Sequence, residues 1–187
     1  MPSVGVLALQ GDVREHVASL GRLGVRACEV RGSDDLTGLD GIVVPGGEST
    51  TIGRLATRFG LIDPLRRRVI DGMPYYGTCA GLILAASAVT EGDQPLLGVL
   101  DVVVQRNAFG RQNESFETEL RISGLAGAFH AVFIRAPWVA KVGADVEVLA
   151  TVGEHPVMVR QGHVLGTSFH PELTGDDRIH QMLLDLV

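Results

Sequence analysis

The first half of the chain alternates between apolar runs of strand length and segments with helical spacing, and this alternation constrains the fold most strongly. The strand-like runs are SVGVLAL (3–9), VRACEV (25–30), LDGIVVPGG (39–47) and MPYYG (73–77). Helical segments are expected at 12–24, at 49–60 and 62–72 with a break near Pro64, and at 82–89. Strands that alternate with helices predict an α/β fold with an open, mostly parallel sheet and helices on both faces.

The second half of the chain has a different pattern. Strand-like runs follow one another at 96–107, 115–122, 131–137, 146–152 and 155–170. Successive strands without helices between them predict antiparallel strands added to the sheet. A helix is expected over 175–187, with acidic residues in its first turn that favour the helix dipole. Because the sequence shows no linker or repeat, we predict a single domain over residues 1–187.

Composition and charge exclude several classes of partner. The formal net charge is −6 and no basic stripe is visible, which argues against nucleic-acid binding. No run approaches the roughly 18 apolar residues of a membrane span, and the N-terminus lacks the positive region of a signal peptide. Two cysteines, Cys28 and Cys79, do not make a disulfide framework. Both are therefore expected to be reduced, which suits the cytoplasm.

Four loops of the sequence carry reactive groups or flexible backbone. In an open parallel sheet, ligands bind beyond the carboxyl ends of the strands. The loops expected at that edge are QGD (10–12), PGGEST (45–50), GTCAG (77–81) and the loop that ends in FHPEL (169–173). Although these loops are far apart in sequence, the fold is expected to bring them together.

Cys79 is enclosed by small residues in Gly77-Thr78-Cys79-Ala80-Gly81, between a predicted strand and a predicted helix. A sharp strand-to-helix turn projects one side chain above the sheet and requires small neighbours, as in the nucleophile elbow G-x-S-x-G. Backbone dipoles at the start of the helix favour the thiolate. We therefore predict that Cys79 is a nucleophile, whereas Cys28 has no such frame and is expected to be a core residue.

A nucleophilic thiol requires a base, and His170 in SFHPEL is the best candidate among the six histidines. Pro171 disfavours the α region for His170 and holds it in extended backbone. Glu172, two residues further on, is expected on the same side of the extended chain. A carboxylate there can orient the imidazole and stabilise its charged form, as the acid of a catalytic triad does.

Acyl transfer also requires donors for an oxyanion. Gly46 and Gly47 end a strand without a β-carbon in the way of a substrate, so their N–H groups are candidates. The N–H of Ala80, directly after the nucleophile, is another. The loop lacks the Gly-Lys-Ser/Thr of a Walker A motif, which excludes nucleotide hydrolysis by that route. No cysteine–histidine spacing predicts a zinc site.

Three motifs, PGGES (45–49), GTCAG (77–81) and FHPE (169–172), occur together, and in them the chain resembles the class I (triad) glutamine amidotransferases, which have a flavodoxin-like sheet. The resemblance extends over almost the whole chain through GVLALQGDVREH, PGGESTTIGRL, VVVQRNAFGRQNESFE, VFIRAP and GTSFHPELTGD. These stretches are similar to the branch of the family that passes ammonia to a separate synthase subunit for pyridoxal 5′-phosphate. The resemblance therefore implies such a synthase as partner, in a multi-subunit complex, and L-glutamine as substrate.

The resemblance also implies the catalytic roles. Cys79 would attack the carboxamide of glutamine and form a γ-glutamyl thioester, His170 would act as base and then as acid, and Glu172 would orient His170. No cofactor and no metal ion are implied. The loop at Gln10 resembles the segment that meets the synthase and helps to complete the oxyanion hole.

Glutamine binding is implied for a further set of residues, namely Gly47, Glu48, Ser49, Arg106, Ile134 and Arg135. A guanidinium suits the α-carboxylate of a free amino acid. The spacing alone does not distinguish Arg106, Arg111 and Arg135 for that contact.

Two alternatives belong to other classes of protein. A cysteine hydrolase of the DJ-1/protease-like group would have a histidine directly after the elbow cysteine, where this chain has Ala80. A non-catalytic flavodoxin-like binding module would leave the combination of Cys79, His170 and Glu172 without a purpose.

Overall fold

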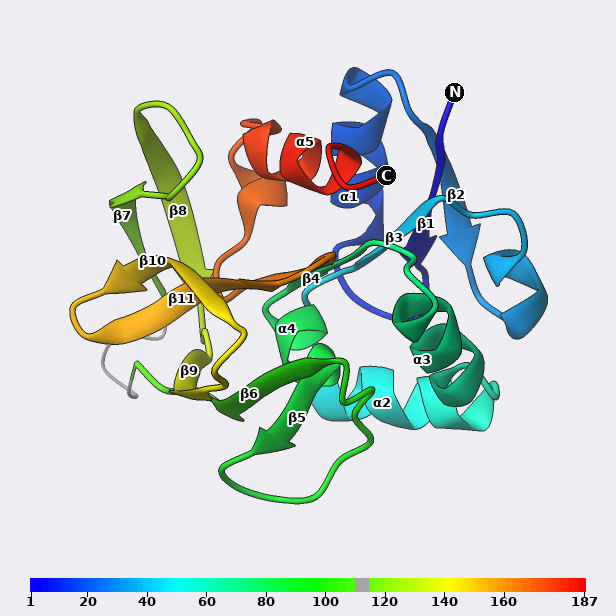
Figure 1. Ribbon diagram of the computed structural model, residues 1–187, viewed down its shortest axis with the longest axis horizontal. Helices are drawn as coiled ribbons and strands as arrows, with labels where there is room; N and C mark the ends of the chain where they lie inside the picture. Colours follow the sequence, from blue (N-terminus) through cyan, green and yellow to red (C-terminus); the bar gives the residue numbers. More distant parts are fainter. Residues whose placement is uncertain (110–114) are drawn as a thin grey trace.

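The computed structural model describes residues 1–109 and 115–187, and a seven-stranded sheet runs through its middle (Figure 1). Its strand order is β10-β11-β12-β4-β3-β1-β2. The strands are β1 (Ser3–Leu7), β2 (Arg26–Val30), β3 (Gly41–Val44), β4 (Tyr75–Thr78), β10 (Glu147–Val152), β11 (His155–Gln161) and β12 (Val164–Thr167). Five of them, β12, β4, β3, β1 and β2, are parallel, while β11 and β10 continue the sheet in antiparallel pairing.

Helices cover both faces of this sheet (Figure 1). On one face lie α1 (Val13–Arg22) and α5 (Arg178–Leu184), and on the other α2 (Ser49–Arg58), α3 (Ile62–Ile70) and α4 (Ala80–Ala85). Leu20 of α1 and Ile179 of α5 pack into one buried cluster, whereas Ile52 of α2 and Leu65 of α3 belong to the other. The predicted fold class, a mostly parallel sheet between two helical layers, is confirmed.

The strands between β4 and β10 form two smaller sheets. One has the order β5-β6-β9, with β5 (Ala86–Val89), β6 (Leu100–Gln105) and β9 (Trp138–Val142). The other is the antiparallel pair of β7 (Ser115–Arg121) and β8 (Ala128–Ile134). None of the helices within residues 1–109 and 115–187 combines the length and the apolar character that crossing a membrane would require.

Several expectations for individual elements were wrong, and each has a physical reason. The helix expected over 82–89 ends at Ala85, because the carbonyls of Leu84 and Ala85 accept hydrogen bonds from the N–H groups of Leu97 and Val99. The break expected near Pro64 lies earlier, at residues 59–61. Pro64 itself fits in the first turn of α3, where its missing N–H has no intrahelical partner to lose.

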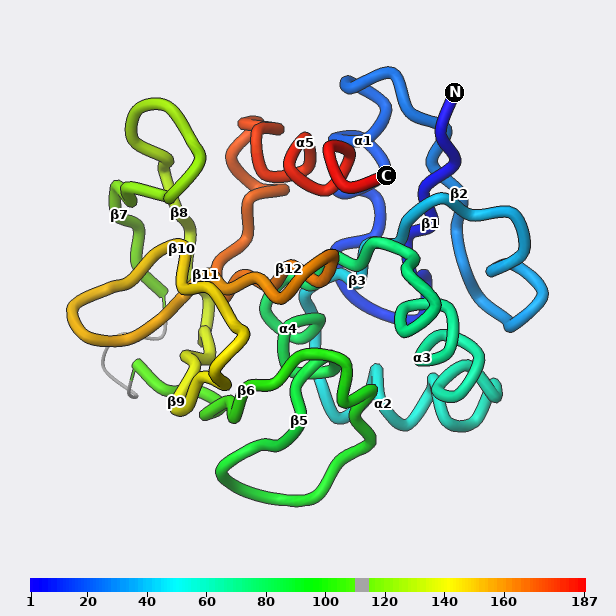
Figure 2. The backbone as a smooth tube through the Cα atoms, in the orientation of Figure 1, coloured from blue at the N-terminus to red at the C-terminus, as the bar shows by residue number. Residues whose placement is uncertain are grey.

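The last strands also differ from the expected antiparallel additions. The tube in Figure 2 shows β12 lying in the middle of the sheet, where it pairs in parallel with β4. Between residues 142 and 167 only β10 and β11 are antiparallel additions to the central sheet. The final helix is shorter than expected, and the acidic residues Asp176 and Asp177 precede its first residue. The central position of β12 matters most, because it carries the chain directly to His170.

Candidate active site

A cavity of about 360 Å³ lies at the carboxyl edge of the parallel strands. The loops after β1, β3, β4 and β12 meet there, which are the four loops expected at this edge. The lining residues are Gln10, Asp12, Gly47, Glu48, Ser49, Cys79, Ile83, Arg106, Asn107, Ile134, Arg135 and His170. A cavity of this size is typical of a small-molecule site.

Cys79 occupies a strained turn between β4 and α4. Its φ is 48° and its ψ −98°, a combination that a non-glycine residue rarely adopts. A β-carbon at Gly77 would overlap the backbone of Gly81, and one at Gly81 would overlap the carbonyl of Val44. The small frame of the Gly-x-Cys-x-Gly sequence is therefore a steric requirement of the turn that exposes the thiol to the cavity.

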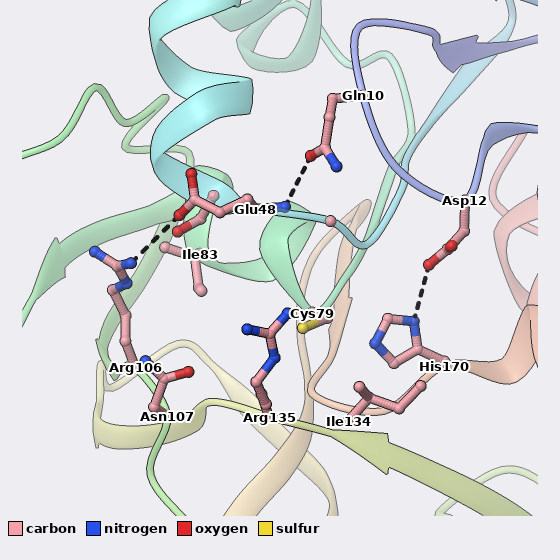
Figure 3. A pocket seen from close by; sticks show the side chains of 12 residues that line it. Gln10, Asp12, Glu48, Cys79, Ile83, Arg106, Asn107, Ile134, Arg135 and His170 are labelled. Carbon is pink, nitrogen blue, oxygen red and sulfur yellow. Dashed lines mark hydrogen bonds and ion pairs between the residues drawn. The ribbon is translucent and has the colours of Figure 1, made fainter. Parts of the chain in front are cut away.

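His170 lies between the thiol and a buried carboxylate. Its Nδ1 is 2.7 Å from Oε1 of Glu172, and its other ring nitrogen faces Cys79 across the cavity floor (Figure 3). The backbone of His170 has φ −109° and ψ 86°, outside the α region, as expected from Pro171. Glu172 differs from the expectation of an extended chain, because it lies in the 3₁₀ turn Pro171–Leu173. That turn brings its carboxylate back to the ring.

Charges around His170 outweigh its burial. Burial opposes the charged imidazolium, yet hydrogen bonds to Asp12, Cys79 and Glu172 raise the pKa of His170 to about 12. Burial raises the pKa of Glu172, although the interaction with His170 opposes the shift. The site therefore holds a proton on the imidazole, in contact with both a sulfur and a carboxylate.

Asp12 is a second carboxylate at the ring that the sequence did not reveal. Its Oδ2 is 3.4 Å from Nδ1 of His170, and it reaches the cavity from the loop after β1 (Figure 3). The loop at 10–12 was expected at the site, but nothing in the sequence pairs Asp12 with a residue 158 positions away. Asp12, His170 and Glu172 also place three potential metal-ligand atoms within 4.8 Å of one another. The hydrogen bond between His170 and Glu172 already uses the histidine nitrogen of that group.

The glycine loop after β3 is held from two sides. Oε1 of Gln10 accepts a hydrogen bond of 2.8 Å from the N–H of Glu48, and a β-carbon at Gly47 would collide with the same Gln10 side chain. The carboxylate of Glu48 caps α2 by accepting from the N–H groups of Thr50 and Thr51. Gln10 therefore contacts the backbone that was expected to supply an oxyanion donor.

Two arginines reach the cavity from the opposite side (Figure 3). Arg106 follows β6, and its Nη2 is 3.5 Å from Oε1 of Glu48. Arg135 follows β8 directly after Ile134, and both line the cavity. The third candidate, Arg111, lies outside the described residues.

Backbone strain is concentrated at this cavity. Among the described residues, three non-glycine residues have positive φ, namely Cys79 at 48°, Asn107 at 46° and Arg135 at 42°. All three line the cavity. Residues held in such conformations cluster at functional sites, where the surrounding structure compensates for the strain.

The structure brings nine of the eleven predicted site residues to the cavity wall: Gln10, Gly47, Glu48, Ser49, Cys79, Arg106, Ile134, Arg135 and His170. The other two lie behind it, Ala80 at the start of α4 and Glu172 beyond His170. Asp12, Ile83 and Asn107 also line it and were not predicted. The asparagine offered one weak signal, since Asn tolerates positive φ better than most residues.

Comparison with known proteins identifies the family of this chain. The family model described as SNO glutamine amidotransferase family matches residues 6–187. A curated relative from Parafrankia sp. (strain EAN1pec), named pyridoxal 5′-phosphate synthase subunit PdxT, is 61% identical over 100% of this chain and 93% of its own. The PdxT of Mycobacteroides abscessus is 58% identical over 100% of this chain and 97% of its own.

A solved structure described as a glutamine amidotransferase is 57% identical and superimposes with a TM-score of 0.94, covering 98% of this chain and 97% of its own. The agreement in sequence extends across the whole fold, which decides against both a DJ-1-like hydrolase and a non-catalytic flavodoxin-like module. The chain belongs to the SNO glutamine amidotransferase family.

Proposed function

We propose that the chain hydrolyses L-glutamine to L-glutamate and ammonia through a γ-glutamyl thioester on Cys79. The observation that carries this proposal is the alignment of Cys79 and His170 at one end of the cavity with Glu172 behind them, and a hydrogen bond of 2.7 Å joins His170 to Glu172. A nucleophile, a base and a group that orients the base are the three components of triad catalysis.

The chemistry follows from that alignment. With the proton on His170, the sulfur of Cys79 attacks the carboxamide carbon and forms a tetrahedral oxyanion. Collapse of this intermediate breaks the C–N bond, and His170 gives its proton to the leaving ammonia. His170 then removes a proton from water, which attacks the thioester, releases glutamate and restores the sulfur. Glu172 holds the ring orientation throughout.

The oxyanion is assigned to two backbone donors, the N–H groups of Ala80 and Gly47. Gln10 affects the second of these, because its side chain contacts the glycine loop and accepts from Glu48. A change at Gln10 would alter the orientation of the neighbouring peptides. Removal of one oxyanion donor costs roughly 10²–10³ in rate.

Substrate binding is assigned to both sides of the cavity. The guanidinium groups of Arg106 and Arg135 suit the α-carboxylate of glutamine. The remaining contacts are proposed for Gly47, Glu48, Ser49 and Ile134, which line the same cavity. All of these residues line one cavity of this chain.

We further propose that the ammonia passes to a separate synthase subunit that makes pyridoxal 5′-phosphate. The support is the name of the relatives, pyridoxal 5′-phosphate synthase subunit PdxT, at 61% and 58% identity over the full chain. The loop at Gln10 is the proposed contact with the synthase. We place the enzyme in the cytoplasm, where a catalytic thiol remains reduced.

The test is ammonia release at saturating glutamine, with the chain alone and with excess cognate synthase. We expect slow release from the isolated chain, an increase on addition of the synthase, and no release from Cys79→Ala under either condition. Equal rates with and without the synthase would overturn the activation. Full activity of Cys79→Ala would overturn the assignment of the nucleophile.

A further inference from the structure

Two more imidazoles lie behind the carboxylate of Glu172, on the side away from the cavity. His16 belongs to α1 and His180 to α5, and both are completely buried. Nδ1 of His16 is 2.8 Å from Nε2 of His180. The ring of Tyr76 packs edge-on against both, with interplanar angles of 87° and 88°. The mechanism derived above uses neither histidine.

The histidine pair reaches the catalytic residues through Nε2 of His16. That atom is 3.2 Å from Oγ1 of Thr78, the residue before Cys79, and 3.6 Å from Oε1 of Glu172. The first distance is a hydrogen bond, and the second is a close electrostatic contact. Among the described residues, Oε2 of Glu172 has no hydrogen-bond partner. The side chains that face Oε1, His170 and His16, therefore contribute to the orientation of this carboxylate.

Both rings are neutral at physiological pH. Burial and the neighbouring His180 and His170 lower the pKa of His16 well below its usual value. Burial lowers the pKa of His180 to about 4, against an opposing effect of Asp177. Each ring therefore carries a single N–H, and the two protons have only two arrangements that keep the hydrogen bond between the rings.

The surroundings favour one arrangement. If His180 donates from Nε2 to Nδ1 of His16, then His16 carries its proton on Nε2 and directs it towards Thr78 and Glu172. In the reverse arrangement, a lone pair of His16 would face the Glu172 carboxylate. His180 would also bury an N–H on Nδ1, an atom without a partner in the described part of the chain. An orphaned buried donor is costlier than an orphaned acceptor.

We infer that His16 is a positioning residue for Glu172, and that His180 holds His16 in the tautomer this role requires. Four residues then form the orienting chain behind the thiol of Cys79: His170, Glu172, His16 and His180. This inference rests on the proposed glutaminase function for its kinetic consequences. Its geometric part concerns the tautomers of the two buried rings, and it can be tested without measuring activity.

Two substitutions of His16 separate positioning from packing. The amide nitrogen of Gln takes the place of Nε2, so His16→Gln keeps a donor towards Glu172. His16→Asn keeps only an acceptor in the place of Nδ1. We expect His16→Asn to lower kcat by roughly 10–100-fold, the loss seen for groups that orient the ligands of metal sites, with KM unchanged. His16→Gln should recover to within about threefold of wild type; equal losses in both variants would overturn the inference.

A double-mutant cycle tests whether His16 acts through Glu172. In a Glu172→Gln background the charge that His16 orients is gone, so His16→Asn should change kcat by less than about twofold further. General damage to the fold would instead multiply the two losses. Thermal unfolding of each variant, measured in parallel, reports any such damage.

Nitrogen-15 correlation spectra of the imidazole rings test the tautomers directly, in wild-type protein at pH 7. His16→Gln and His180→Gln serve only to assign the signals. We expect Nε2–H on both rings, and Nδ1–H on either ring would overturn the inference even if all variants were misfolded. Wild-type protein that releases no ammonia with synthase present would refute the proposed function, while the expected tautomers would still support the geometric part.

Discussion

Gly46 lies directly against the imidazole of His170. A β-carbon at Gly46 would approach Nδ1 of His170 to 2.9 Å and its Cε1 even more closely, with Oδ2 of Asp12 at 3.3 Å. The glycine loop after β3 and the histidine after β12 therefore fit together with no space for a methyl group. The loop expected to hold the oxyanion also fixes one side of the base.

We predict that Gly46→Ala lowers kcat by about 100-fold, because the added β-carbon forces the ring of His170 to move, and a misplacement of roughly 1 Å in a catalytic site can cost about 100-fold in rate. The measurement is steady-state ammonia release in the presence of synthase. Gly21→Ala is the matched control. Gly21 lies on α1 with no atom near the position of an added β-carbon, so this variant should keep kcat and gain about 0.5–1 kcal/mol in free energy of unfolding. Normal turnover by Gly46→Ala would show that the ring tolerates the displacement.

The two cysteines make a second matched pair. Cys79→Ala should reduce turnover by more than about 10⁴-fold, because the residual catalysis of a triad without its nucleophile comes from binding and oxyanion stabilisation alone. Cys28→Ala should keep activity, since Cys28 lies on β2 and does not line the cavity. The check is ammonia release together with circular dichroism. Loss of activity in Cys28→Ala alone would move the nucleophile to the second strand.

The sequence was sufficient to predict the parallel strands β1 to β4 and the four loops that carry the chemistry. The strands β1, β3 and β4 are short apolar runs that end in glycine-containing or polar loops, so local pattern and tertiary role agree. The steric need for glycine at Gly77 and Gly81 is visible in the sequence as a motif, and its cause in the structure is the close approach of the Gly81 and Val44 backbone.

Other features depend on contacts between distant residues, and no local pattern encodes them. The end of α4 at Ala85 is decided by N–H groups of Leu97 and Val99. The parallel pairing of β12 with β4 joins residues about 90 positions apart. Asp12 and His16 lie at the start of α1, where the sequence pattern is that of an ordinary amphipathic helix. In the structure Asp12 lies beside His170, and His16 lies beneath Glu172.

Arg106 provides a test of substrate binding. We expect Arg106→Gln to raise KM for glutamine by roughly 10–100-fold, the loss that accompanies a hydrogen bond to a charged group, with little change in kcat. Arg106→Lys should recover only part of the affinity, because an ammonium cannot bind a carboxylate in two-point fashion. Arg135→Gln measured in parallel assigns the larger share to one arginine. A fall in kcat at constant KM would contradict a role in ground-state binding.

The buried histidines predict how stability depends on pH. The pKa of His180 is about 4 in the folded state and about 6.5 in an unfolded chain. Between these values the unfolded chain binds more protons. The stabilisation is therefore complete above about pH 6.5 and is lost as the pH falls towards 4, with a size on the order of 3 kcal/mol. Asp177, Arg22 and His16 are the ionisable groups that influence His180 most directly.

Urea unfolding at pH 7 and pH 5 measures this effect. His130 serves as the comparison, because its pKa in the folded protein is shifted in the opposite direction from that of His180. His180→Gln should flatten the loss of stability between the two pH values. His130 is exposed on β8, and its contacts with Glu119 and Glu117 raise its pKa, so its contribution is present below about pH 6.5 and is lost as the pH rises through the folded pKa. His130→Gln should therefore steepen the acid loss. Identical slopes for wild type and His180→Gln would show that His180 is not held neutral in the folded protein.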